Sequence, residues 1–146
     1  MENESQPSVL IVDDTMENLQ VLAEMLRSRN YKVAVAKDGM KALNFVSKRK
    51  PDLILLDIMM PEMDGFEVCG KLKADPETKE IPVIFISALA ETSDKLKGFE
   101  TGGVDYITKP FRQEEVFARV KTHLDLKFSR EALKKVNESL AVANAT

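Results

Sequence analysis

The stretch DLILLDIMMPEMDGFEV, Asp52 to Val68, places a carboxylate directly after four consecutive apolar residues. An apolar run of this kind is typical of a strand that is covered on both faces, as in a parallel sheet. An ionised carboxylate avoids apolar surroundings unless a partner or a metal compensates for the lost hydration. Asp57 therefore needs a chemical reason to stand at the end of this strand.

Four other apolar runs alternate with segments of helical period along the 146-residue chain. Strands that are separated by helices indicate βαβ units and a parallel sheet with helices on both faces. We therefore expect an α/β, doubly wound, flavodoxin-like fold with a five-stranded parallel sheet in the order 2-1-3-4-5. The predicted strands are Ser8–Val12, Tyr31–Ala36, Asp52–Asp57, Val83–Ala88 and Asp105–Pro110.

Apolar residues at helical spacing predict a helix after each of the first three strands. A weaker pattern covers Ser93–Glu100, and Gly102 with Gly103 is placed to end that helix. The three predicted stripes comprise Leu19, Leu22, Ala23 and Leu26, then Met40, Leu43 and Val46, then Phe66, Cys69 and Leu72.

The last helical pattern is too long for such a domain, because no Gly or Pro interrupts it from Gln113 to Ala145. A first apolar stripe suits docking on the sheet, and a second, offset stripe follows heptad spacing. We predict a disordered N-terminus (1–7), a sheet domain (8–126) and an amphipathic, coiled-coil-like linker helix (127–146). The docking stripe comprises Val116, Val120 and Leu124, and the heptad stripe comprises Leu126, Leu133, Val136 and Leu140.

The composition excludes several classes of protein. The chain is 44% hydrophobic and 31% charged, an ordinary globular balance. Its net charge of -3 gives no basic surface for nucleic acid, so we expect no direct nucleic-acid contact. The single cysteine, Cys69, excludes an internal disulfide. No apolar run approaches the roughly 18 residues of a membrane span, so we expect a cytoplasmic protein that does not contact the membrane.

Polar residues gather where the predicted strands end. The first strand is followed by Asp13 and Asp14, and the later ones deliver Asp57, Ser87 and Lys109. The carboxyl ends of parallel strands share one edge, where open α/β folds bind ligands. Converging carboxylates repel one another unless positive charge neutralises them, and oxygen-only ligands favour Mg²⁺. Helix capping explains Asp14 or Ser87 alone, but it leaves Asp57 and Lys109 unexplained.

The motifs VDD, LLDIMMPEMDG, ISA and DYITKPF, in that order, resemble the receiver domain of two-component response regulators. The resemblance covers about Ser8 to Leu126. It implies a phosphorylation-activated switch that takes a phosphoryl group on Asp57 from a sensor histidine kinase or phosphotransfer protein. The reaction would be Mg²⁺-dependent, and the chain would catalyse only its own phosphoryl transfer and dephosphorylation.

The same resemblance implies roles for the other residues at this edge. Asp14, Asp57 and the backbone carbonyl of Met59 match the Mg²⁺ ligands, with Asp13 assisting through water. Lys109 matches the ammonium group that pairs with the phosphoryl oxygens. The matching hydroxyl is that of Ser87.

The resemblance also implies a route for the signal. Inward movement of Ser87 would make room for Tyr106, the aromatic switch residue, and would alter the face formed by helix 4, strand 5 and helix 5. The bond between Lys109 and Pro110 matches a cis peptide bond. The C-terminal helix would lead to an output domain or partner, and a homodimer through it is a further expectation. His123 is expected to be an ordinary helix residue, and Gly103 replaces the usual alanine.

Other functions remain open on the sequence. A Mg²⁺-dependent phosphatase with an aspartate nucleophile normally has an acid two residues later, where Met59 stands. A flavin-binding electron carrier needs a phosphate loop after the first strand, and VDDTMEN would repel phosphate. A constitutive, receiver-like dimerisation module is the remaining alternative.

Overall fold

The computed structural model describes residues 6–88 and 97–145, with side chains as far as Leu140. Five strands form one parallel sheet in the order β2-β1-β3-β4-β5, which confirms the predicted topology. The first strand has the predicted bounds, and the others are one or two residues shorter than predicted. The strands are β1 (Ser8–Val12), β2 (Lys32–Ala36), β3 (Leu53–Asp57), β4 (Val83–Ser87) and β5 (Asp105–Thr108).

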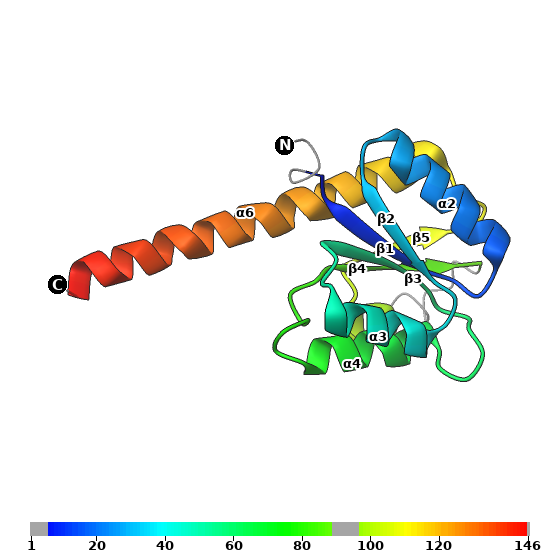
Figure 1. Ribbon diagram of the computed structural model, residues 1–146, viewed down its shortest axis with the longest axis horizontal. Coiled ribbons are helices and arrows are strands. Elements are labelled where there is room, and N and C mark those ends of the chain that lie inside the picture. Colours follow the sequence, from blue (N-terminus) through cyan, green and yellow to red (C-terminus); the bar gives the residue numbers. More distant parts are fainter. Residues whose placement is uncertain (1–5, 89–96, 146) are drawn as a thin grey trace.

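Helices cover both faces of the sheet (Figure 1). One face carries α2 (Met16–Ser28) and α6 (Gln113–Ala145), and the other carries α3 (Gly39–Lys48) and α4 (Gly65–Ala74). Of the helix that we predicted over 93–100, the structure describes residues 97–100, which are helical, and the rest lies outside the described residues.

The side chains of each central strand alternate between two hydrophobic cores. In β1, Val9 and Ile11 pack towards α2 and α6, whereas Leu10 and Val12 pack towards α3 and α4. The four apolar residues of β3 are all fully buried because both faces of the strand are covered. This explains why β3 reads as a continuous apolar run instead of an alternating pattern.

The predicted stripe of α3 is wrong at Met40, whose side chain is 64% exposed. The buried face of α3 runs instead through Gly39, Ala42 and Val46. At Gly39 the helix lies so close to α4 that a Cβ atom would come within 2.8 Å of the Val68 side chain. Because Gly39 makes this close contact with α4, the buried face of α3 begins at Gly39, and Met40 points to solvent.

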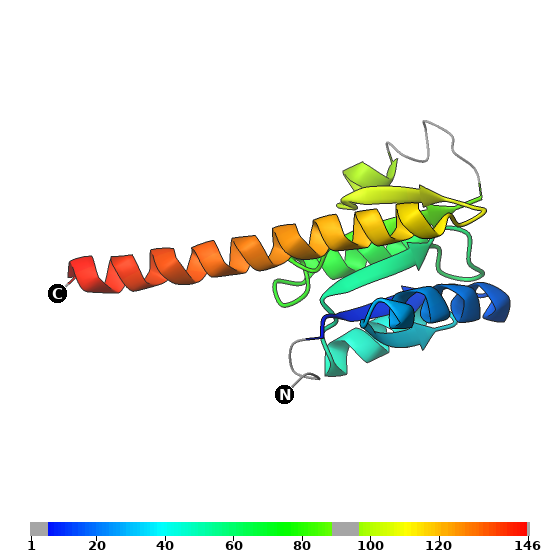
Figure 2. The same ribbon diagram turned by 90° about the horizontal axis from the view of Figure 1, so that it is seen from above.

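The last helix changes from a docked to an exposed element along its length. Val116 and Val120 are fully buried and Leu124 is 2% exposed, whereas Leu126 is 53% exposed. Every described side chain from Phe128 to Leu140 is exposed. Figures 1 and 2 show residues 128–145, called the rod below, projecting beyond the sheet. No helix within the described residues is both long and apolar enough to span a bilayer.

Candidate functional site

Three predicted carboxylates meet at the carboxyl edge of the sheet. Asp57 is the last residue of β3 and is 2% exposed. Because Leu56 of β3 pairs with Val12 of β1, the residue after β1, Asp13, lies beside Asp57. Carboxylate oxygens of Asp13, Asp14 and Asp57 lie within 4.8 Å of one another. Asp13 is fully buried and Asp14 is exposed, so the cluster opens to solvent on one side.

The loop after β3 folds back tightly against Asp57. The backbone N–H of Gly65 donates to the carbonyl of Ile58 at 2.9 Å. A Cβ atom at Gly65 would lie 2.9 Å from the Ile58 Cα and would also overlap the carbonyl oxygen of Asp57. Asp64 then caps α4 by accepting from the backbone N–H of Glu67 at 2.9 Å. Asp64 and Gly65 therefore begin α4 in close contact with the backbone of Asp57 and Ile58.

Lys109 is the positive charge of the cluster. Its Nζ lies 3.5 Å from Asp57 Oδ1 and 3.6 Å from Asp13 Oδ2. Lys109 follows β5, and its backbone N–H donates to the carbonyl of Ser87 at 2.8 Å. Its peptide bond to Pro110 is cis. Among the described residues, one ammonium group thus lies beside two of the three carboxylates, and the cluster keeps an excess of negative charge.

Asp13 is fixed from the side of α2. It accepts from the backbone N–H of Thr15 at 2.9 Å and from Asn18 Nδ2 at 3.2 Å. It therefore satisfies groups at the start of α2 as well as facing Lys109. Sequence reasoning missed Asn18, because nothing in the motif distinguishes it from the other polar residues in the first turn of this helix.

The charge on Asp57 is disfavoured by its surroundings. The pKa of Asp57 is raised to about 6: burial contributes most, the charges of Asp13 and, less strongly, Asp14 add to it, and Lys109 opposes the increase. A hard divalent cation would relieve this repulsion, and the cluster offers it only oxygen ligands. The residues present therefore fit Mg²⁺.

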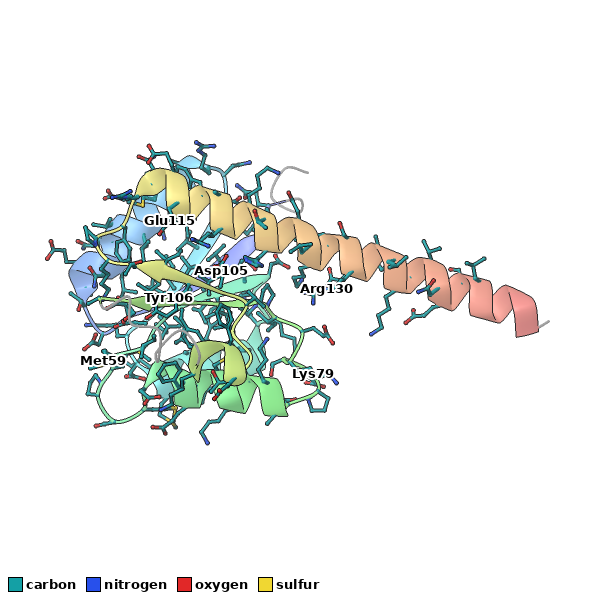
Figure 3. All side chains as sticks on the ribbon, turned by 180° about the vertical axis from the view of Figure 1, so that it is seen from behind. Met59, Lys79, Asp105, Tyr106, Glu115 and Arg130 are labelled. Atoms are coloured by element: carbon teal, nitrogen blue, oxygen red, sulfur yellow. The ribbon has the colours of Figure 1, made fainter. Side chains whose placement is uncertain are left out.

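The remaining predicted residues lie around this edge. Ser87 ends β4 and is 2% exposed, and the residue before it, Ile86, pairs with Asp57. Tyr106 is 7% exposed on β5 and packs into the core on the side of α3 and α4. Met59 is 72% exposed and lies at the end of the molecule away from the rod (Figure 3).

A second charged cluster stands at the start of β5. Asp105 accepts from Arg119 Nη1 at 2.6 Å and lies 2.8 Å from His123 Nε2. Burial alone would raise the pKa of Asp105, but the hydrogen bonds from His123, Arg119 and the Tyr106 backbone outweigh burial and lower it. Sequence reasoning treated His123 as an ordinary helix residue. The available signal was that Arg119 and His123 stand four residues apart on one helix face.

The fold and the site define the class of the protein: an open α/β domain with an acidic cluster and a lysine where the central strands end. Residues 9–121 match the response regulator receiver domain. The chain belongs to this family, whose domains are the receivers of two-component signalling.

Relatives and solved structures agree with this assignment. The chain is 46% identical over 114 residues to response regulator PleD of Caulobacter vibrioides, covering 78% of this chain and 25% of that protein. It is 41% identical over 140 residues to a probable cyclic di-GMP phosphodiesterase of Vibrio cholerae, covering 96% of this chain and 32% of that protein. A crystal structure of a putative response regulator from Chloroflexus aurantiacus has a TM-score of 0.80 and 36% identity, covering 83% of this chain and 99% of that one. The chain thus spans a quarter to a third of the length of these two curated relatives.

Proposed function

We propose that the chain is a phosphorylation-activated signalling switch in which Asp57 accepts a phosphoryl group from a histidine kinase or phosphotransfer protein. The observation that carries this proposal is the buried Asp57 carboxylate, with Lys109 Nζ at 3.5 Å and two further carboxylates beside it. A carboxylate oxygen of Asp57 attacks phosphorus, the N–P bond to the donor histidine breaks, and that histidine takes up a proton. Because the pKa of Asp57 is about 6, the attacking group is ionised at neutral pH.

Mg²⁺ is the cofactor of this proposal. Asp14, Asp57 and the backbone carbonyl of Met59 would hold it, with Asp13 acting through water. When bound, the ion supplies positive charge beside the non-reacting phosphoryl oxygens. Lys109 adds a positive charge on the side of β5, and Ser87 offers a hydroxyl donor from β4.

The signal then leaves through β5. Phe85 of β4 pairs with Tyr106, and Ser87 pairs with Thr108, so a shift at the end of β4 acts directly on β5. We propose that Ser87 moves towards the phosphoryl oxygens and that Tyr106 fills the space beside it. This rearrangement alters the surface formed by residues 97–100, β5 and α6.

The rod is the proposed route to an output domain or partner protein in the cytoplasm. The match to the Vibrio cholerae phosphodiesterase extends over 140 residues and therefore includes most of the rod. The enzymatic name of that relative applies to a protein about three times the length of this chain. We assign this chain no reaction other than its own phosphorylation and dephosphorylation.

A second copy of the chain is the proposed partner of the rod itself. Its apolar stripe lies roughly 150° around the helix axis from the docking residues, at about 100° per residue. A partner helix that packs on this stripe therefore lies on the side of α6 that faces away from the sheet. In a parallel pair, Asp125 would flank the stripe opposite Arg130 of the partner, a favourable charge pairing. The stripe begins at Leu126, two residues before the rod, and continues along the rod through Leu133, Val136 and Leu140; each of these residues is more than half exposed.

The test is incubation with acetyl phosphate and Mg²⁺, followed by intact-mass measurement of wild type, Asp57→Asn and the control Asp125→Asn. We expect wild type and the control to gain one phosphoryl group and Asp57→Asn to gain none. Steady turnover of a generic phosphomonoester would favour a phosphatase instead. Failure of the wild type to gain mass from any phosphodonor would contradict the proposal.

A further inference from the structure

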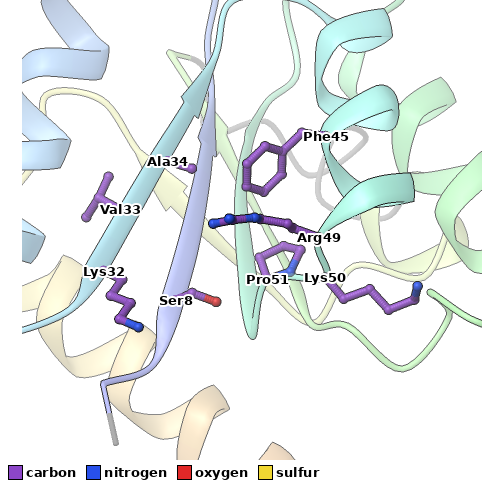
Figure 4. Close-up of a pocket in the computed structure, with 8 residues that line it drawn as sticks. All are labelled: Ser8, Lys32, Val33, Ala34, Phe45, Arg49, Lys50 and Pro51. Atoms are coloured by element: carbon purple, nitrogen blue, oxygen red, sulfur yellow. The ribbon is translucent and has the colours of Figure 1, made fainter. Parts of the chain in front are cut away.

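A pocket (Figure 4) lies where β1 and β2 begin, which is the end of these strands opposite to the acidic cluster. It has a volume of about 420 Å³ and opens between β1, the edge strand β2 and the end of α3. This volume falls within the roughly 300–1,000 Å³ of small-molecule sites. The lining residues are Ser8, Lys32, Val33, Ala34, Phe45, Arg49, Lys50 and Pro51.

Two of the basic side chains in this pocket have no partner within the described residues. Neither Arg49 nor Lys32 makes a side-chain hydrogen bond or ion pair there. Figure 4 shows the Arg49 side chain reaching from α3 towards the strands, with Phe45 on one side and Pro51 on the other. Lys50 differs, because its Nζ lies 3.5 Å from Glu77 and its side chain points away from the other lining residues.

Asp52, the acidic residue that follows Pro51 in the sequence, already has other partners. Asp52 accepts from the backbone N–H of Ser8 at 2.8 Å. Its other oxygen lies 3.2 Å from Lys127 Nζ on α6. Asp52 therefore does not neutralise Arg49 or Lys32, and among the described residues the pocket keeps a positive charge beside apolar walls.

We infer that this pocket binds a small organic anion whose phosphate, phosphonate or carboxylate group is attached to a flat apolar body. The planar guanidinium of Arg49 suits two-point recognition of such an anion. Lys32, whose side chain points away from Arg49 in Figure 4, adds positive charge at the edge of the pocket. Phe45, Ala34 and Pro51 provide the apolar surface for the body of the ligand. The site is distinct from the acidic cluster, so this inference stands or falls independently of the proposed phosphorylation.

The test is titration of ¹⁵N-labelled protein with phenylphosphonate in the absence of Mg²⁺. This probe carries the anion and the ring, and its C–P bond prevents transfer to Asp57. We expect saturable shifts at the amides of Lys32, Val33 and Phe45. Arg49→Gln should weaken binding at least about tenfold, and Arg49→Lys, which keeps the charge without the planar group, should weaken it less.

The control variant is Lys48→Gln, which removes the same charge one residue before Arg49 but outside the pocket lining. We expect the affinity of Lys48→Gln for phenylphosphonate to stay within about twofold of wild type, because Lys48 makes no contact with the ligand and its exposed charge is screened by salt. An equal loss in Lys48→Gln and Arg49→Gln would overturn the inference, since it would indicate non-specific attraction. The amide spectrum away from the pocket reports whether each variant is folded.

Three further probes separate the contributions of charge and ring. Benzoate that saturates the same amides would extend the site to carboxylates, and its failure beside phenylphosphonate would restrict the site to phosphate-like groups. Inorganic phosphate should bind more weakly because it lacks the ring. Binding of benzyl alcohol as tight as that of the anions, shifts centred on Asp57, or no saturation by either aromatic anion would overturn the inference.

Discussion

Asp57 lies in surroundings that disfavour its ionised form, because it is buried and close to other carboxylates. Its pKa of about 6 lies above the value of roughly 3.9 for an unfolded aspartate. A pKa that is raised by folding contributes stability that is complete below the unfolded value and is lost as pH rises through the folded value. Near neutral pH the native state therefore carries an unfavourable charge. This cost is what we expect of a carboxylate retained for reaction and metal binding.

Asp57→Asn should therefore stabilise the metal-free protein near neutral pH. A shift of about two pKa units corresponds to at most about 3 kcal/mol in the free energy of unfolding. The difference from wild type should shrink as pH falls from about 6 and should vanish only below about 3.9, where the wild-type carboxyl is protonated in both states. Urea denaturation followed by circular dichroism in EDTA measures it across this range. A difference that does not vary with pH would contradict the explanation.

Asp14→Asn should remove the stabilisation by Mg²⁺ while leaving the metal-free protein nearly unchanged. Asp14 is exposed, so its loss alone should alter the free energy of unfolding by less than about 0.5 kcal/mol. We expect millimolar Mg²⁺ to raise the Tm of wild type and not that of the variant, because a ligand stabilises only the state that binds it. Asp125→Asn, on α6 and outside the acidic cluster, serves as the comparison. An unchanged Mg²⁺ effect in Asp14→Asn would argue against its role as a ligand.

The acidic cluster was accessible from the sequence because its carboxylates stand where two separate apolar runs end. Parallel strands place those ends at one edge, so linear positions translated directly into proximity. The contact of Asp105 with Arg119 and His123 was not accessible in this way. It depends on the distance and rotation at which α6 docks against β5, and periodicity does not specify either. The ion pair between Asp52 and Lys127 could not be predicted from the sequence for the same reason.

At the scale of elements, Gly103 is required by the packing of β4. A Cβ atom at Gly103 would come within 2.7 Å of Phe85 Cδ2, and the Phe85 side chain is 1% exposed. The ring fills the space that the alanine usual at this position would need. The sequence identified the departure, but the reason for it lies in a contact between two segments.

Gly103→Ala should therefore destabilise the protein by about 1–3 kcal/mol, the usual cost of overpacking a core. Gly70→Ala is the matched control, because within the described part of the chain no atom outside the local backbone of its own helix lies within 4 Å of a Cβ at that position. It should stabilise α4 by up to about 1 kcal/mol, the helix propensity difference. Thermal unfolding of both variants should show a lower Tm than wild type for Gly103→Ala and a higher one for Gly70→Ala. A stable Gly103→Ala variant would show that Phe85 can move aside.

The helix faces and strand order followed from the periodicity of apolar residues, with one instructive exception in α3. Met40 has the right spacing for the buried face, yet Gly39 occupies the contact with α4. A pattern that counts only large apolar residues overlooks a glycine at a close helix crossing. The topology was insensitive to this error, because it depends on the alternation of elements and not on single positions.

At the scale of the whole molecule, the rod should bring two copies together in parallel. We expect a concentration-dependent dimer in sedimentation experiments that is lost in Leu133→Ser/Leu140→Ser and retained in Lys135→Ser, on the charged face. Ser129→Cys, in the remaining slot of the heptad stripe, should cross-link two chains under oxidising conditions, and Lys135→Cys should not. A wild type that stays monomeric at all concentrations would contradict the pairing.

Strand β3 has one further consequence. Asp57 ends it, and Asp52, which anchors Lys127 of α6, immediately precedes it. At about 3.3 Å per residue, Asp57, the proposed phosphoacceptor, and Asp52, the anchor of Lys127, stand roughly 17 Å apart along the strand. The rod leaves the molecule from the anchor end, opposite to Met59 (Figure 3). A donor approaching the acceptor and a receiver of the signal on the rod therefore do not compete for space. Under the proposed function, phosphorylation of Asp57 and recognition of the rod by a partner can therefore take place on the same molecule at the same time.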